Sequence, residues 1–326
     1  MTAFTRYKEE EYYLNPDTHL PEPFPSLADP PTVSLSVIIP AYNEEYRLPT
    51  MLEEALEYLD ERELHEADFT YEVIIVDDGS SDRTTAVGLL YSEKYGVDKI
   101  RVLKLRKNRG KGGAVRLGFL VARGERLLFA DADGATKFAD LNRLEEGLAN
   151  TIYGEDNCAV VIGSRSHLQS EAVAHRSFFR NILMYGFHLL VWLLTVRTVK
   201  DTQCGFKLFT REAARRLFSN LHVERWAFDV ELLYLAERLG IPVTEVPVNW
   251  QEIAGSKIVP VLTWLQMGWD IGLIWLWYLL GIWRVSPGDG GKNLGPSGDR
   301  TTDHWADGGG DGEPSAHRNL TRLKDD

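Results

Sequence analysis

Apolar runs alternate with helical patterns between Ser34 and Arg165, and this alternation constrains the fold more than any other feature of the chain. Five runs rich in β-branched and aromatic residues predict strands: Val37–Ile39, Val73–Val76, Val102–Leu103, Leu127–Phe129 and Val160–Ile162. The segments between them predict helices: Leu48–Leu59, Arg83–Tyr95, Gly112–Ala122 and Asp140–Leu148. Because the strand runs are apolar throughout, each strand should be buried on both faces. We therefore predict an α/β fold in which helices flank a mostly parallel sheet.

Two carboxylates lie one residue apart where the fourth of these runs ends. Asp131 directly follows Ala130, and Asp133 comes two positions later. A hard divalent ion such as Mg²⁺ or Mn²⁺ binds carboxylate oxygens and keeps further positions for the oxygens of a diphosphate. The strand ends of open α/β sheets are also where ligands bind. An acidic turn is the simpler explanation of such a pair alone, but polar loops at the other strand ends favour a metal site.

The loops after the first two strands carry polar residues that suit a nucleotide. Pro40, Tyr42 and Glu44 follow the first strand, and Asp78 follows the second. A carboxylate at such a position can accept hydrogen bonds from a ribose diol or a base imide. The stretch around Asp78 also fits a turn in which Ser81 or Asp82 caps the next helix, and both interpretations can hold together.

Positive charge is available at two further strand ends. Lys111 lies in a glycine-rich loop, where backbone can approach a ligand closely, although a solvated basic turn explains it equally well. Arg165 ends the fifth strand, and Arg176 and Arg180 follow one turn apart on a predicted helix. Guanidinium groups suit phosphate oxygens, but an ordinary basic helix face explains Arg176 and Arg180 equally well.

Two later motifs embed polar groups in apolar surroundings, which is costly unless those groups have partners or a function. The stretch Asp201–Lys207 contains Gln203, and Trp226–Glu231 contains Asp229. We predict both Gln203 and Asp229 as site residues.

Composition limits the class of protein. The chain of 326 residues is long enough for one large domain or two small ones, and its net charge of -12 argues against nucleic acid as a partner. Its two cysteines, Cys158 and Cys204, favour a reducing compartment. Residues 1–33 contain six of the 14 prolines and predict a tethered arm or partly ordered edge without a signal peptide. Residues 287–326 are rich in Gly and Asp and predict a disordered tail.

A tryptophan-rich segment separates the predicted α/β domain, residues 34–250, from the tail. Val259 to Trp283 holds five of the nine tryptophans, with Asp270 in its middle. This pattern favours a helix in the headgroup region of a membrane over a crossing, with Ile182 to Val196 as a second such helix. Residues 251–286 are therefore predicted to be membrane-associated, with Lys257 near the membrane surface; an unusually apolar core helix is the alternative.

The motifs form an ordered set from Ser36 to about Arg284: SVIIPAYNEEYRLP, YEVIIVDDGSSD, KNRGKGGAVRLG, LLFADADGATKF, GSR, DTQCGFKLFTREA, VERWAFDVELLY and GSK. This set resembles family 2 glycosyltransferases of the Rossmann-like GT-A fold, and among them the dolichyl-phosphate glucose synthases. The stretch Gly134–Phe138 looks like the glucose type rather than the related mannose type. The N-terminal transmembrane anchor usual in eukaryotic members is not seen.

The resemblance implies inverting transfer of glucose from UDP-glucose to dolichyl phosphate, for protein N-glycosylation at the cytosolic face of the endoplasmic reticulum membrane. A phosphate acceptor is largely ionised near neutral pH, because its second pKa is about 6, so it needs little or no general base. Asp131 and Asp133 would hold the metal ion, and Asp229 would orient a sugar hydroxyl or an arginine. The residues predicted to bind substrate are Pro40, Tyr42, Glu44, Asp78, Lys111, Asp131, Arg165, Arg176, Arg180, Gln203 and Lys257, the arginines and Lys257 on the acceptor side.

Three other functions fit the residues. The first is a mannosyltransferase that uses GDP-mannose and dolichyl or polyprenyl phosphate. The second is a sugar nucleotidyltransferase, which would form sugar nucleotides rather than consume them. The third is a non-enzymatic binder of sugar nucleotides at a membrane. The sequence predicts no oligomeric state.

Overall fold

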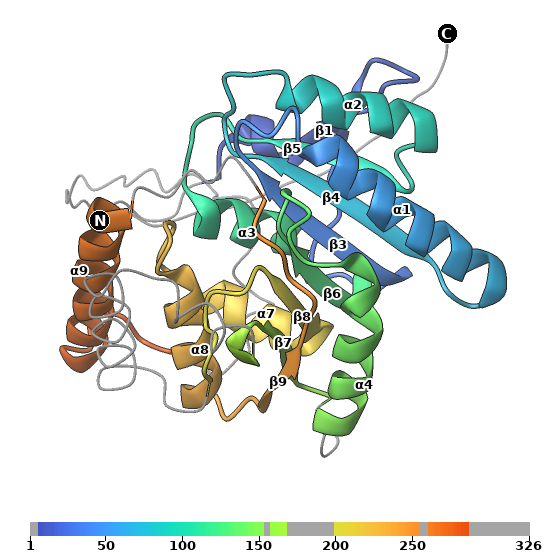
Figure 1. Ribbon diagram of the computed structural model, residues 1–326. Helices are drawn as coiled ribbons and strands as arrows, with labels where there is room; N and C mark the ends of the chain where they lie inside the picture. The colour runs from blue at the N-terminus through green and yellow to red at the C-terminus, as the bar shows by residue number, and fades with distance from the viewer. Residues whose placement is uncertain (1–5, 153–156, 168–198, 254–259, 287–326) are drawn as a thin grey trace, which may run out of the picture. The chain divides into compact units, whose positions relative to one another are not determined.

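A seven-stranded sheet forms the centre of the computed structural model, which describes residues 6–152, 157–167, 199–253 and 260–286 (Figure 1). The strand order is β5-β4-β3-β6-β8-β7-β9. Their bounds are β3 Val33–Ala41, β4 Tyr71–Asp77, β5 Ile100–Lys104, β6 Gly124–Ala130, β7 Val160–Ser164, β8 Phe206–Thr210 and β9 Val243–Pro247. Only β8 runs antiparallel to its neighbours, β6 and β7. The five predicted strands and the mostly parallel sheet are confirmed, whereas β8 and β9 were not predicted.

Helices cover both faces of this sheet. The four predicted helices are present as α1 Leu48–His65, α2 Thr84–Tyr95, α3 Lys111–Leu120 and α4 Leu141–Thr151, and α7 Arg211–Asn220 and α8 Phe228–Arg238 were not predicted. Successive residues of β3 enter different cores: Val37 and Ile39 pack with α1 and α4, and Ile38 packs with α3, α7 and α8. This alternation is the physical reason for the uninterrupted apolar runs, because both faces of each strand are buried.

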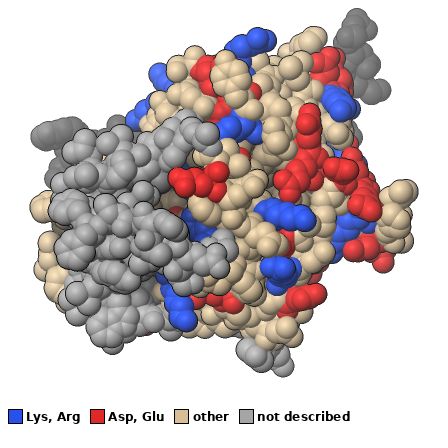
Figure 2. Space-filling model, viewed as in Figure 1, with Lys and Arg blue, Asp and Glu red and all other residues tan. Residues whose placement is uncertain are grey.

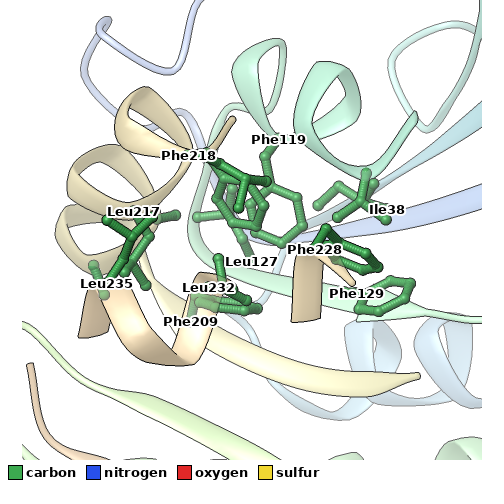
Figure 3. Packing of buried hydrophobic residues seen from close by; sticks show 14 of the residues in the cluster. Ile38, Phe119, Leu127, Phe129, Phe209, Leu217, Phe218, Phe228, Leu232 and Leu235 are labelled. Atoms are coloured by element: carbon green, nitrogen blue, oxygen red, sulfur yellow. The ribbon is translucent and has the colours of Figure 1, made fainter. Parts of the chain in front are cut away.

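Aromatic packing joins α7 to the sheet and so fixes β8 beside the centre (Figure 3). Phe119 of α3 stacks on Phe218 of α7 with ring centroids 3.9 Å apart. Phe209 of β8 meets the Phe119 ring edge-on at 5.1 Å. Full burial of such a side chain contributes about 1.5–3 kcal/mol. The packing therefore holds β8 and α7 against α3.

The N-terminal stretch contains a short 3-10 helix, Lys8–Glu11, and a two-stranded antiparallel ribbon, β1 Tyr12–Leu14 and β2 Pro21–Pro23. β1 packs beside β5. The sequence predicted an arm or a partly ordered edge, and none of these three elements.

One helix, α9 (Pro260–Leu279), lies within the predicted membrane-associated segment. Its residues Ile271 and Ile274 are fully buried in the same core as α8, whereas Trp269 is 71% exposed and Leu279 63% exposed. Within the described ranges, no helix combines the length and the apolar character that a membrane span requires. Ile182–Val196 and the tail from 287 onward lie outside the described residues.

Candidate active site

The site lies where the strand order reverses. From β3 the chain moves to β4 and β5 on one side, and then crosses to β6 on the other side of β3. Ligands of open α/β sheets bind outside the carboxyl ends of the strands at such a point. The loops after β3 and β6 meet here, since Arg47 Nη1 is 3.9 Å from Asp133 Oδ2. Sequence order alone does not reveal this neighbourhood.

Backbone contacts fix the two carboxylates that follow β6. The Asp131 N–H donates to the carbonyl of Gly205 at 3.0 Å, and Asp133 Oδ1 accepts the N–H of Ala135 at 3.1 Å. Gly134 has φ of +67°, a conformation that glycine adopts at little cost. Burial, and then the charge of Asp131, raise the pKa of Asp133. Such a pair gains stability from any cation that lies between its members.

Lys111 supplies a cation to this pair. It is the first residue of α3, and its Nζ lies 2.8 Å from Asp131 Oδ1 and 3.0 Å from Oδ2. Burial acts to lower the pKa of this ammonium, but the charges of Asp131 and Asp229 outweigh it and the pKa is raised. Lys111 thus lies in the site as a charged group and not in a solvated turn.

Gly205 leaves the space that the Asp131 carboxylate occupies. A Cβ at position 205 would lie 1.9 Å from Asp131 Oδ2. The antiparallel pairing of β8 with β6, in which Phe206 faces Ala130, brings this glycine beside the acid. The absence of a side chain at Gly205 thus lets the Asp131 carboxylate take its place next to Asp133, and two carboxylates fit the donor set of a hard divalent ion. In the described parts of the chain, no three His, Cys, Asp or Glu side chains form a complete metal site.

Asp229 is held by a buried lysine. Lys207 of β8 is fully buried, and its Nζ donates to Asp229 Oδ1 and to the carbonyl of Cys204, both at 2.6 Å. Asp229 lies in the first turn of α8 and is 4% exposed. Burial raises the pKa of Asp229, while Lys207 and Lys111 act in the opposite direction. Asp229 therefore connects Lys207 to Lys111 and Asp131, and these four residues together with Asp133 form a charge cluster.

Arg165, at the end of β7, is engaged by Asp201. Its Nε and Nη2 donate to the two oxygens of Asp201 at 2.8 and 2.9 Å, and its backbone N–H donates to the same carboxylate at 2.9 Å. The guanidinium lies 5.3 Å from the centre of the Trp250 ring. Burial acts to lower the pKa of Arg165, but Asp201 outweighs it and the pKa is raised. The charge of Asp131 also raises the pKa of Arg165, so these two side chains interact electrostatically.

The two acids predicted to bind the nucleotide have protein partners. Glu44 accepts a two-pronged contact from Arg47 at 2.6 and 2.7 Å. Asp78 accepts the N–H groups of Arg109 and Gly110 at 2.7 and 2.9 Å, and burial is the main cause that raises its pKa to about 7. Asp78 thus fastens the glycine-rich loop next to the site.

The cap predicted at Ser81 or Asp82 is wrong, because α2 begins at Thr84 with Arg83 as its N-cap residue and without a side-chain cap hydrogen bond. Asp82 lies one position earlier, and its Oδ1 accepts the N–H of Thr84 at 2.9 Å.

The remaining predicted residues are placed less centrally. Pro40 lies in β3 opposite Val76, Tyr42 is 40% exposed in the following loop, and the Gln203 amide points to Met267 of α9 with Nε2 3.6 Å from Sδ. Arg176, Arg180 and Lys257 lie outside the described residues.

Sequence reasoning missed four residues of the site: Arg47, Asp201, Gly205 and Lys207. The signal for Lys207 was a lone lysine inside an apolar strand, which needs a buried partner. Arg47 and Gly205 carry no local signal, because their roles arise from strands and loops that are distant in sequence.

This sheet, with paired carboxylates at its switch point, fits the class of nucleotide-sugar transferases. The family model for glycosyl transferase family 2 matches residues 36–218, more than half of the chain. A structure of glucosyl-3-phosphoglycerate synthase from Mycobacterium tuberculosis, in complex with Mn²⁺, UDP and phosphoglyceric acid, aligns with a TM-score of 0.50 at 20% identity. It covers 76% of this chain and 79% of that one, and the likeness shows the GT-A fold.

Sequence relatives define the family more narrowly. The dolichyl-phosphate beta-glucosyltransferase of Drosophila melanogaster is 59% identical over 86% of both chains. The enzyme of the same name from Homo sapiens is 57% identical over 87% of this chain and 88% of that one. The chain belongs to the dolichyl-phosphate beta-glucosyltransferases, which confirms the predicted resemblance and the fold class.

Proposed function

We propose that this protein transfers glucose from UDP-glucose to dolichyl phosphate with inversion at the anomeric carbon. The observation that carries the proposal is the carboxylate pair Asp131 and Asp133 at the switch point of the sheet, with Lys111 on Asp131. The names of the relatives supply the sugar and the acceptor. The stretch Gly134–Phe138 agrees with the glucose type.

We propose further that Asp131 and Asp133 hold Mg²⁺ or Mn²⁺ together with the diphosphate of the donor. Two protein carboxylates leave most positions of a six-coordinate ion open, which suits phosphate oxygens. When bound, the ion supplies positive charge to the departing UDP. Lys111 adds a second positive charge on the same side, because its ammonium already lies within 3.0 Å of Asp131.

In the reaction an oxygen of the acceptor phosphate forms a bond to the anomeric carbon. The bond from that carbon to the diphosphate oxygen breaks, and its electron pair leaves with UDP. The acceptor is already an anion near neutral pH, so no side chain has to remove a proton. Asp229 bound to Lys207 therefore acts through its neighbours as a positioning group. Arg165, held in place by Asp201, presents positive charge to the acceptor phosphate.

We propose that α9 attaches the enzyme to the cytosolic face of the endoplasmic reticulum membrane. Support comes from the exposed apolar side chains of this segment: Trp269, Trp275, Leu276, Leu279, Leu280 and Ile282. The opposite face packs in the core through Ile271 and Ile274, so the helix would lie in the plane of the interface. Gln203 contacts Met267, which links this helix to the site.

Point variants test the membrane proposal better than truncation, since truncation before α9 would remove Ile271 and Ile274 and expose the core that they cover. We expect Trp269→Ser with Leu279→Ser to weaken flotation with phospholipid vesicles. Leu90→Ser on α2, where Leu90 is 60% exposed, is the matched control and should float like the wild type. Vesicle binding that is unchanged in the α9 variant, or full-length protein that stays soluble without detergent or lipid, would contradict the proposal.

The transfer reaction is tested by incubating the enzyme with dolichyl phosphate and labelled UDP-glucose or labelled GDP-mannose. Label in the organic extract from UDP-glucose, absent in Asp131→Asn, is the expected result. Label from GDP-mannose alone would establish the mannosyltransferase instead. Formation of UDP-glucose from UTP and glucose 1-phosphate, with no lipid product, would establish a nucleotidyltransferase.

A further inference from the structure

A glutamate of the N-terminal segment is buried against the glycine-rich loop. Glu10 lies in the 3-10 helix and is 0% exposed. Its carboxylate accepts the N–H of Tyr7 at 3.0 Å, the N–H of Arg106 at 3.1 Å and the Nη2 of Arg109 at 3.0 Å. Burial of a carboxylate is costly unless it is paired and hydrogen-bonded. The number of its partners marks Glu10 as part of the domain and not as a charge on a loose arm.

Arg109 connects this glutamate to the donor side of the site. Its Nη2 contacts Glu10, and its Nη1 lies 3.5 Å from Glu224 Oε1. The backbone N–H of the same residue donates to Asp78 Oδ1 at 2.7 Å. Arg109 thus joins the N-terminal segment, the stretch before α8 and the acid at the end of β4.

The residues after Arg109 lead directly to the charge cluster. Gly110 has φ of +88°, and its N–H donates to Asp78 Oδ2 at 2.9 Å. A Cβ at Gly110 would lie 2.8 Å from the carbonyl of Glu224, so the loop has no room to shift in that direction. Lys111 follows, with its Nζ on Asp131. A displacement of Arg109 would therefore move Gly110, the residue directly before Lys111.

The aromatic ring of Tyr7 adds a second contact between the same segments. Arg106, Lys107 and Arg109 lie 4.8, 5.6 and 5.1 Å from the centre of this ring. Cations are attracted to such ring faces. The N-terminal segment thereby compensates three neighbouring positive charges that would otherwise repel one another beside the site.

We propose that Glu10 is a positioning residue for the sugar-nucleotide donor: it holds Arg109 so that Gly110 and Lys111 meet the diphosphate. This inference deepens the proposed function and rests on it, because it assigns the loop to the donor and not to the lipid acceptor. Glu10 itself does not touch the substrates.

The test compares Glu10→Ala and Glu10→Gln with Glu11→Gln, which makes the same charge change on an exposed neighbour of the same 3-10 helix. Calorimetry with UDP-glucose measures donor affinity in the full-length protein, and transfer assays measure KM for each substrate. Because Glu10→Ala removes the partner that holds Arg109, the donor Kd should rise about tenfold, which corresponds to about 1.4 kcal/mol. KM for dolichyl phosphate and the properties of Glu11→Gln should stay within about twofold of wild type.

A double variant separates positioning from general destabilisation. Because Glu10 acts through Arg109, we expect Arg109→Gln combined with Glu10→Gln to weaken donor binding no more than the stronger single change. Wild-type donor affinity in folded Glu10→Ala would overturn the proposal, and so would equal increases in KM for both substrates. If Glu10→Ala does not fold, the donor Kd of Glu10→Gln decides in the same way. A wild-type protein that does not bind UDP-glucose would instead overturn the proposed function.

Discussion

The buried pair of Lys207 and Asp229 allows a quantitative test of the charge cluster. Its Nζ–Oδ1 distance is 2.6 Å, and the two side chains are 0% and 5% exposed. Removal of one partner of a buried pair leaves an uncompensated charge and costs about 3–5 kcal/mol. Asp229→Leu and Lys207→Met should each lower the free energy of unfolding by that amount. The melting temperature should fall on the order of 10 °C.

The double variant Asp229→Leu with Lys207→Met should lose less stability than the sum of the two single losses. Replacement of both charges by apolar groups is often neutral or stabilising, by about 1–4 kcal/mol. The Cys204 carbonyl loses its Lys207 donor, however, and that loss costs about 1–3 kcal/mol. We therefore expect the double variant within about 2 kcal/mol of wild type, well above the additive value.

Urea unfolding of the full-length protein in mild detergent measures these differences, and transfer assays across pH accompany it. Asp229→Asn should lower the rate but keep the acid limb of the pH profile, which belongs to the acceptor phosphate with a second pKa of about 6. Additive single losses would refute the pairing argument. An acid limb that disappears in Asp229→Asn would show that Asp229 titrates as a base.

Four further changes test other parts of the site. Asp131→Asn should reduce transfer by roughly 10²–10³-fold and EDTA should act likewise; full activity without divalent ions would contradict this. Arg165→Lys loses the two-pronged contact with Asp201 and should lower kcat/KM about tenfold. A wild-type kcat/KM would show that the reaction does not need this contact. Gly205→Ala should lower the rate roughly a hundredfold, because its Cβ would lie 1.9 Å from Asp131 Oδ2, and Gly268→Ala, which meets nothing within 4 Å, is its control. The pKa of Asp78 is raised from 3.8 to about 7, so its ionisation opposes folding and the free energy of unfolding should fall as pH rises between these values. Urea titrations of Asp78→Asn should show a smaller fall of the free energy of unfolding with pH. The same fall as in the wild type would contradict the raised pKa of Asp78.

The sequence alone determined the class of fold and the position of the carboxylate pair. Runs such as Val73–Val76 are apolar on both faces, and only a sheet between helix layers buries both faces of a strand. The same local order places Asp131 and Asp133 at a strand end, where a parallel sheet binds its ligands. The ordered motifs pointed to the family, which the relatives confirm.

The partners of these residues were decided only by tertiary structure. Glu10 and Arg109 lie 99 positions apart in sequence, and the Arg165 and Asp201 fork joins residues 36 positions apart. Lys207 meets Asp229 because β8 inserts antiparallel between β6 and β7. Such contacts depend on strand order and on the packing of distant helices. Periodicity reports only on the environment of each residue, so it indicates that Lys207 needs a buried partner and does not indicate which acid provides it.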